Sequence, residues 1–139
     1  MKNILIYFIF FALVSSCGRK TNPEPPEFRS PASVSGLVAN ATDSHIKLNW
    51  ILPSVNLQGK DLNNLRYVTI KRKLYDSKNF EELIRLNPKT NHFFDESVEL
   101  GSIYDYIIFV SNDQKGAINN IIRVNYQGAN SKVNIIGAN

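Results

Sequence analysis

Hydrophobic and polar positions after residue 33 alternate in short segments that turns interrupt, and no long 3.6-residue periodicity is present. Residues 45–50, HIKLNW, show the alternation most clearly, because Ile46, Leu48 and Trp50 fall on one face. Strict alternation over this length is typical of a strand with one buried face. The pattern therefore predicts an all-β domain with little helix.

The same alternation predicts seven strands, which cover residues 33–39, 45–50, 65–75, 80–86, 93–95, 103–111 and 117–126. Short strands separated by turns about every 8–12 residues are typical of a β-sandwich, because two sheets are needed to cover their apolar faces. In the third strand we expect Val68 and Ile70 to face inward. Its Tyr67, Thr69 and Lys71 then face outward.

The N-terminal segment differs from the rest, because residues 2–16, KNILIYFIFFALVSS, hold one lysine followed by an apolar run from Ile4 to Val14. An eleven-residue run is too short to cross the bilayer core as a helix. A basic start, a short apolar stretch and small residues at its end indicate a secretory signal peptide over residues 1–16. The alternative is a buried N-terminal helix or strand.

Cys17, the only cysteine in the chain, follows this segment directly. The stretch Val14-Ser15-Ser16-Cys17 resembles a bacterial lipobox, the cleavage signal of lipoproteins. The resemblance implies that Cys17 becomes the first mature residue and carries a covalent diacylglyceryl lipid, with no other cofactor. Each buried methylene adds about 0.8 kcal/mol to membrane attachment. The expected location is the cell envelope, with the outer membrane favoured because Gly18 rather than aspartate follows Cys17.

Residues 17–32 form a proline-rich linker, which we expect to be an extended spacer because proline fixes φ and removes a backbone donor. Arg19 and Lys20 have two interpretations. Beside a lipid anchor, they are placed to contact anionic headgroups. Alternatively, Cys17-Gly18-Arg19-Lys20 followed by prolines resembles the mature start of a small lipoprotein that assists the outer-membrane lipopolysaccharide translocon. That resemblance implies a partner contact instead.

Residues 31–126 resemble a bacterial fibronectin type III domain. The matching positions are Pro31, Leu37-Val38-Ala39, Ile46, Leu48, Trp50, Phe93-Phe94-Asp95, Gly101, Tyr104-Asp105-Tyr106 and Gly116. The resemblance implies a seven-stranded, immunoglobulin-like β-sandwich in which Tyr104 forms the tyrosine corner. The expected organisation is residues 1–16 as signal peptide, 17–32 as linker, 33–126 as the type III domain and 127–139 as a tail.

No catalytic motif is found, and we expect a protein that is not an enzyme and has no small-molecule substrate. His45 and His92 lack the spacing of a zinc site. Asp95, Glu96 and Glu99 cluster near a turn, where calcium binding is the alternative to a structural Asp95 beside solvated glutamates. A net charge of +4 without a basic stripe or a fold signature argues against a nucleic-acid partner.

A candidate binding face follows from the expected register and is formed by Tyr67, Thr69, Ile107, Phe109 and Ile121. An exposed apolar patch of this kind marks a partner site, here for a protein or a glycan. Two alternatives stay open. A register shift of one residue reverses every side chain, and the tail, with its apolar residues at 133, 135 and 136, could cover the patch.

The run Lys71-Arg72-Lys73 is the densest stretch of charge in the chain. Alternation places Lys71 and Lys73 on one face of the strand and Arg72 on the other. Charged side chains on a sheet discourage aggregation, which is one explanation for the run. An anion-binding or lipopolysaccharide-facing surface is the other.

Overall fold

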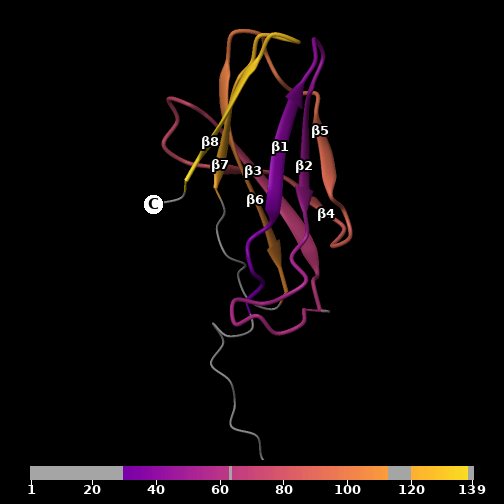
Figure 1. The fold of residues 1–139 in the computed structure, drawn as a ribbon. Coiled ribbons are helices and arrows are strands. Elements are labelled where there is room, and N and C mark those ends of the chain that lie inside the picture. Colours follow the sequence, from indigo (N-terminus) through magenta and orange to yellow (C-terminus); the bar gives the residue numbers. More distant parts are fainter. Residues whose placement is uncertain (1–29, 63, 113–119, 138–139) are drawn as a thin grey trace, which may run out of the picture.

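The computed structural model describes residues 30–62, 64–112 and 120–137, and within these ranges the chain forms eight strands and no helix (Figure 1). The strands are β1 (Ser35–Ala41), β2 (Ile46–Ile51), β3 (Tyr67–Leu74), β4 (Glu81–Leu86), β5 (His92–Asp95), β6 (Ile103–Ser111), β7 (Ile121–Asn125) and β8 (Lys132–Ile136). The predicted signal peptide and the residues Cys17, Arg19 and Lys20 lie outside the described residues. Across the described part of the chain, no helix is long and apolar enough to cross a bilayer.

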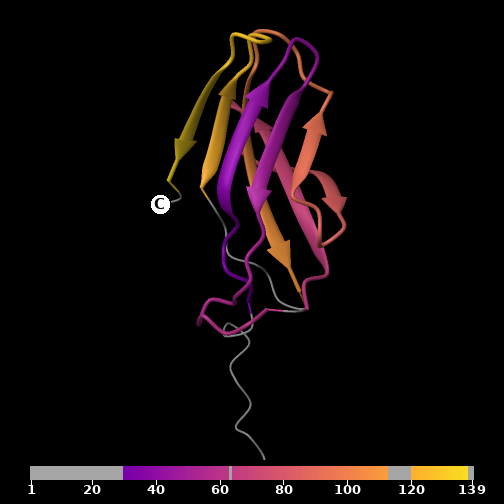
Figure 2. The same cartoon turned by 45° about the vertical axis from the view of Figure 1, so that its right-hand side comes forward.

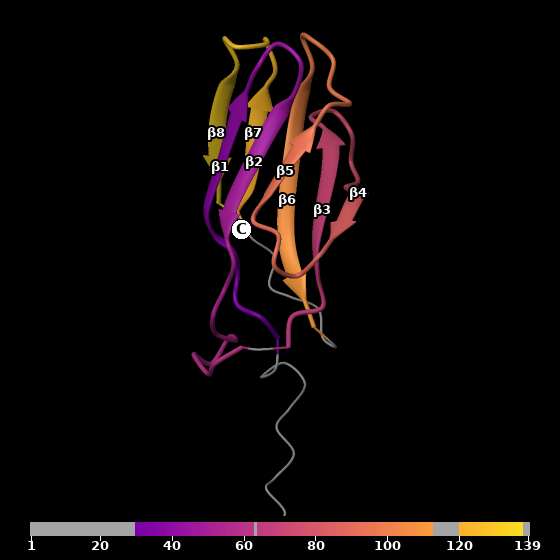
Figure 3. The same cartoon turned by 90° about the vertical axis from the view of Figure 1, so that its right-hand side faces the viewer.

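Two antiparallel sheets form the sandwich, one with the order β1-β2-β5 and the other with the order β4-β3-β6-β7-β8. Figure 3 shows the smaller sheet in front of the larger one, with β8 and β4 at opposite edges. The predicted all-β sandwich is therefore confirmed. Short antiparallel strands of this kind bury one face each, and the two buried faces pack against one another.

The core lies between the sheets and follows the alternation of the sequence. Ile46, Leu48 and Trp50 are 0%, 0% and 3% exposed, as the pattern of β2 predicts. The Trp50 indole N–H donates a hydrogen bond to the carbonyl oxygen of Thr90 at 3.0 Å, which satisfies its one polar atom. Val68 and Ile70 of β3 are also fully buried, so the predicted inward face of this strand is confirmed.

The eighth strand is a departure from the seven that the sequence predicts. Residues of the expected tail form β8, which pairs with β7 in a regular register from Asn125 opposite Lys132 to Ile121 opposite Ile136. β8 thus extends the five-stranded sheet at its edge. On the outer side, β8 places Ile136 opposite Ile121, and it pairs with neither β3 nor β6, which hold the other four residues of the candidate binding face.

The turn between β7 and β8 is held against the turn between β1 and β2. The Tyr126 hydroxyl donates to the Thr42 carbonyl oxygen at 2.9 Å, and the Ala129 amide donates to Oδ1 of Asp43 at 2.9 Å. Gly128 has a φ of +60° and lies directly against Asp43. These contacts connect the start of β8 to the smaller sheet.

Candidate binding face

The five residues predicted to form a binding face all lie on the outer side of the five-stranded sheet. Tyr67 and Thr69 belong to β3, Ile107 and Phe109 to β6, and Ile121 to β7. Thr69 is paired directly with Phe109 across the two strands. The expected register is therefore correct, and a one-residue shift is excluded for these strands.

Their exposure differs from the prediction. Thr69 is only 1% exposed and Ile107 only 9%, whereas Tyr67, Phe109 and Ile121 are partly exposed. The expectation that Thr69 and Ile107 present open surface is wrong. Both lie in the centre of a sheet whose neighbouring side chains are long enough to cover them.

Cationic side chains lie over the aromatic rings of this face. The Arg85 guanidinium carbon is 4.5 Å from the centroid of the Tyr67 ring, and the Lys71 ammonium is 5.7 Å from that of Phe109. Two further pairs have their rings beyond the end of β3. The Arg123 guanidinium carbon is 4.3 Å from the centroid of the Tyr75 ring, and the Lys73 ammonium is 5.5 Å from that of Phe80. A positive charge over a ring face is attractive, and the aliphatic stems cover apolar surface. The face is therefore a mixed aromatic and cationic surface rather than an open apolar patch.

A buried carboxylate stabilises one end of this surface. Asp105 is 1% exposed and accepts two hydrogen bonds from Arg123, at 2.6 Å to Nε and 2.9 Å to Nη2. The Lys73 ammonium lies 3.7 Å from the same carboxylate. The hydrogen bond to Asp105 raises the pKa of Arg123. A two-point contact fixes the guanidinium plane, which in turn sets its position over Tyr75.

Sequence reasoning missed this contact, although a signal was present. Asp105 is a charged residue between Tyr104 and Tyr106 in a strongly apolar strand. A carboxylate at a central position of a sheet requires a partner. Arg123 of the adjacent strand is that partner, paired directly opposite Asp105.

A second buried carboxylate joins the two sheets on the inner side. Asp95, at the end of β5, accepts hydrogen bonds from Arg72 Nη1 at 2.6 Å and from the Tyr106 hydroxyl at 2.7 Å. The Ser97 amide and hydroxyl also donate to it, at 3.0 and 2.7 Å. Burial, and then the charge of Asp95, raise the pKa of Tyr106 well above its usual range. Arg72 thus faces inward, as the alternation predicts, and holds a structural ion pair.

The calcium alternative for this region does not fit. Both carboxylate oxygens of Asp95 are already engaged by protein donors. Within the described ranges, no group of three or more histidine, cysteine, aspartate or glutamate residues could hold a metal ion. Asp95 therefore has a structural role, which is the first of the two interpretations.

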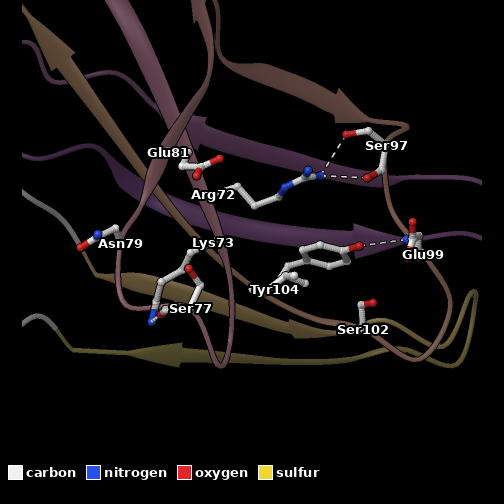
Figure 4. A pocket seen from close by; sticks show the side chains of 10 residues that line it. Arg72, Lys73, Ser77, Asn79, Glu81, Ser97, Glu99, Ser102 and Tyr104 are labelled. Carbon is white, nitrogen blue, oxygen red and sulfur yellow. Dashed lines mark hydrogen bonds between the residues drawn. The ribbon is translucent and has the colours of Figure 1, made fainter.

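A polar pocket of about 320 Å³ opens beside this network (Figure 4). Its lining includes Arg72, Lys73, Glu81, Glu99 and Tyr104. The Tyr104 hydroxyl accepts a hydrogen bond from the Glu99 amide at 2.9 Å, which is the predicted tyrosine-corner contact. Lys73 donates to the Ser77 carbonyl oxygen at 2.9 Å, so two of the lining side chains serve to hold the surrounding loops.

The two histidines lie elsewhere, on the smaller sheet. The rings of His45 and His92 both meet Phe94 edge-on, at centroid distances of 5.2 and 5.8 Å. The His45 Nδ1 is 3.0 Å from the Thr42 hydroxyl, in the turn before β2. Neither histidine lines the polar pocket. The serines that line it, Ser77, Ser97 and Ser102, therefore have no imidazole beside them in the pocket.

Comparison with known proteins supports the fold. No protein-family model matches the sequence, and no curated protein sequence matches it. Among solved structures, the twitchin kinase region of C. elegans aligns with a TM-score of 0.60 and 17% identity over 74% of this chain and 18% of that one. A Fn3-like protein from Clostridium thermocellum aligns with a TM-score of 0.52 and 15% identity, over 66% of this chain and 88% of that one.

A third structure, the chicken CNTN1 FN1-FN3 domains, aligns with a TM-score of 0.54 and 15% identity, over 71% of this chain and 33% of that one. The fold is therefore that of a fibronectin type III domain. This chain spans less than a fifth of the twitchin region, so nothing about that kinase's activity transfers. A type III fold is consistent with a non-catalytic binding or structural module.

Proposed function

We propose that this protein is a lipid-anchored lipoprotein of the bacterial cell envelope, in the outer membrane, whose type III domain binds a protein or glycan partner. The observation that supports binding most directly is the outer face of the five-stranded sheet. There, Tyr67 and Phe109 are partly exposed and each lies beneath a cationic side chain. Aromatic and arginine side chains are the types that contribute most to binding at interfaces.

The anchor is supported by the sequence alone, through the lipobox-like stretch that ends at Cys17. Mass spectrometry of the mature protein should find an N-terminal Cys17 with a diacylglyceryl thioether. The Cys17→Ser variant should accumulate as an unprocessed precursor. A mature protein that keeps residues 1–16 and has a free thiol would refute the anchor and the proposed location together.

The binding face has a test that does not depend on the anchor. Chemical crosslinking in the native envelope should capture a partner, and the Tyr67→Ala and Phe109→Ala variants should each reduce its yield at least about fivefold, a loss of roughly 1 kcal/mol. Phe94→Ala is the matched control, because Phe94 is an exposed ring beneath Lys47 on the opposite sheet. Equal losses in all three variants would contradict a binding site on the five-stranded sheet.

A second candidate function is assistance to the lipopolysaccharide translocon. It is favoured by one observation, the Cys17-Gly18-Arg19-Lys20 stretch and the prolines that follow it. In that case the partner contact lies in residues 18–20 rather than in the domain. Translocon components should then co-purify with the lipidated protein and be lost on Lys20→Ala, whereas Tyr67→Ala should leave them bound.

A further inference from the structure

Strand β8 extends beyond the part of the sandwich that the smaller sheet covers (Figure 2). Its Val133 and Ile135 pair with Val124 and Ile122 of β7, which are both fully buried. Val133 and Ile135 are nevertheless 37% and 58% exposed. They lie on the core side of their sheet, but the three-stranded sheet has no strand opposite them. The result is an apolar surface next to an open strand edge.

The other sheet edges have features that discourage pairing with another chain. β4 presents the exposed charges Glu81, Glu82 and Arg85. β1 has an irregular register between Ser35 and Val38, and β5 is only four residues long. Charges, bulges and short length are the usual means by which natural edges avoid association.

β8 is one residue longer than β5, and its one charged residue is the lysine at its start. Its five residues, Lys132–Ile136, pair with β7 without any register shift and include no glycine or proline. Three of the five are apolar. Among the edges that the structure describes, this one is the best suited to accept another strand.

The sequence of β8 is complementary to itself when two copies run antiparallel. Centred on Asn134, such a pair places Asn134 opposite Asn134, Val133 opposite Ile135 and Lys132 opposite Ile136. The four side chains at 133 and 135 then share the uncovered face, and no like charges meet. A parallel, in-register pair would instead place Lys132 beside Lys132, which is unfavourable. We therefore propose that two copies of this chain associate antiparallel through β8, which joins their five-stranded sheets into one continuous sheet.

This arrangement has closed two-fold symmetry, the commonest kind in homo-oligomers, and leaves neither β8 edge open. The contact is small, because it consists of one five-residue strand from each copy. Interfaces below about 1,200 Å² are typical of weak or transient complexes. A covalent trap at the two-fold axis is therefore a more sensitive assay than measurement of mass in dilute solution.

Disulfide trapping tests both the pairing and its register. Directly opposed residues in antiparallel strands have Cα atoms about 4.5–5.5 Å apart, within the range that a disulfide spans. In the full chain, Asn134→Cys should give a disulfide-linked dimer on mild oxidation. Lys132→Cys and Ile136→Cys should each give none alone, because their own copies lie four residues apart, about 13 Å. Co-expressed, these two variants should form a mixed dimer.

The same oxidation of the wild-type chain measures how much disulfide-linked dimer forms through Cys17, the only native cysteine. Ile135→Lys, added to Asn134→Cys, should reduce the crosslinked fraction at least about tenfold, because it places a charge in the apolar cluster. Val38→Lys is its matched control, as Val38 is a similarly exposed apolar residue, at 48%, on β1. Position 135 is 58% exposed, so the charged variant should still fold.

Three outcomes would overturn the proposal. One is the absence of a dimer from Asn134→Cys. Another is equal crosslinking by Lys132→Cys, Ile136→Cys and Asn134→Cys expressed singly, which would indicate random collision. The last is an adduct of Asn134→Cys with a different protein only, which would assign the edge to another partner's strand.

Discussion

At the scale of single residues, Thr69 shows how a position on the outer side of a sheet becomes part of the interior. Its side chain is 1% exposed, and its hydroxyl oxygen has no hydrogen-bond partner. Among the described residues, the Thr69 hydroxyl oxygen is the one buried side-chain polar atom without a hydrogen-bond partner. A hydroxyl removed from water without a replacement bond costs about 1–3 kcal/mol.

Replacing this hydroxyl with a methyl group should therefore stabilise the protein. Thr69→Val keeps the shape of the side chain and suits a strand, so we expect the free energy of unfolding to rise by about 1 kcal/mol in urea titrations. Thr42→Val is the matched control, because the Thr42 hydroxyl accepts a hydrogen bond from the His45 amide at 3.2 Å. That variant should lose stability. A loss in Thr69→Val as well would mean that the Thr69 hydroxyl is satisfied.

At the scale of strands, the sequence predicts well wherever one face alternates clearly. β2 and β6 lie where the pattern placed them, and β6 covers Ile103–Ser111 as expected. The sequence does not predict β8, because its alternation extends over only five residues, Lys132–Ile136, and follows several turn-forming residues. Its strand state depends on pairing with β7, which no local pattern encodes. The burial of Thr69 likewise depends on tertiary pairing, because Thr69 lies between Arg85 of β4 and Phe109 of β6.

The turn before β8 tests how firmly this strand is attached. A side chain at Gly128 would collide with the Asp43 carboxylate, and its φ of +60° is itself unfavourable for alanine. Gly101 has a φ of +86° and open space around it, so Gly101→Ala isolates the backbone strain. We expect Gly128→Ala to lower the free energy of unfolding by about 1–2 kcal/mol more than Gly101→Ala, because the Asp43 carboxylate that accepts the Ala129 amide has to move.

The comparison requires urea unfolding of both variants and of the double variant Asp43→Ala with Gly128→Ala. Removing the carboxylate should recover part of the additional loss, because the collision is with Asp43. Equal losses in Gly128→Ala and Gly101→Ala would show that the turn can move away from Asp43 without a loss of folding free energy. The attachment of β8 to the smaller sheet would then be weaker than its hydrogen bonds indicate.

At the scale of the whole molecule, apolar packing and a buried ionic network join the two sheets. Arg72 of β3 and Tyr106 of β6 reach across the core to Asp95 of β5. The sequence indicated the components separately, with Asp95 as a structural residue and Arg72 on the inward face of its strand. It could not indicate that they meet, because their contact depends on how the two sheets are stacked. The same holds for Asp105 and Arg123 within the larger sheet.

This network should make the fold sensitive to alkaline pH. Burial, and then the negative charge of Asp95, raise the pKa of Tyr106 in the native state, whereas tyrosine in an unfolded chain has a pKa near 10. Stability from this group is fully present below about pH 10. Above it, the unfolded state releases a proton that the native state retains. The free energy of unfolding should therefore fall by up to about 1.4 kcal/mol per pH unit from this residue.

The contribution of Tyr106 is measured by urea unfolding of the wild type and of Tyr106→Phe at pH 8, 10 and 11. At pH 8 the variant should be less stable by about 1–3 kcal/mol, because Asp95 loses a hydrogen-bond donor. Between pH 10 and 11 it should lose less stability than the wild type, so the two curves converge. Tyr75→Phe, which removes a hydroxyl from a ring that is 55% exposed, should keep the wild-type alkaline slope. Parallel curves for Tyr106→Phe and the wild type would contradict a buried, neutral Tyr106 and the link between the sheets that depends on it.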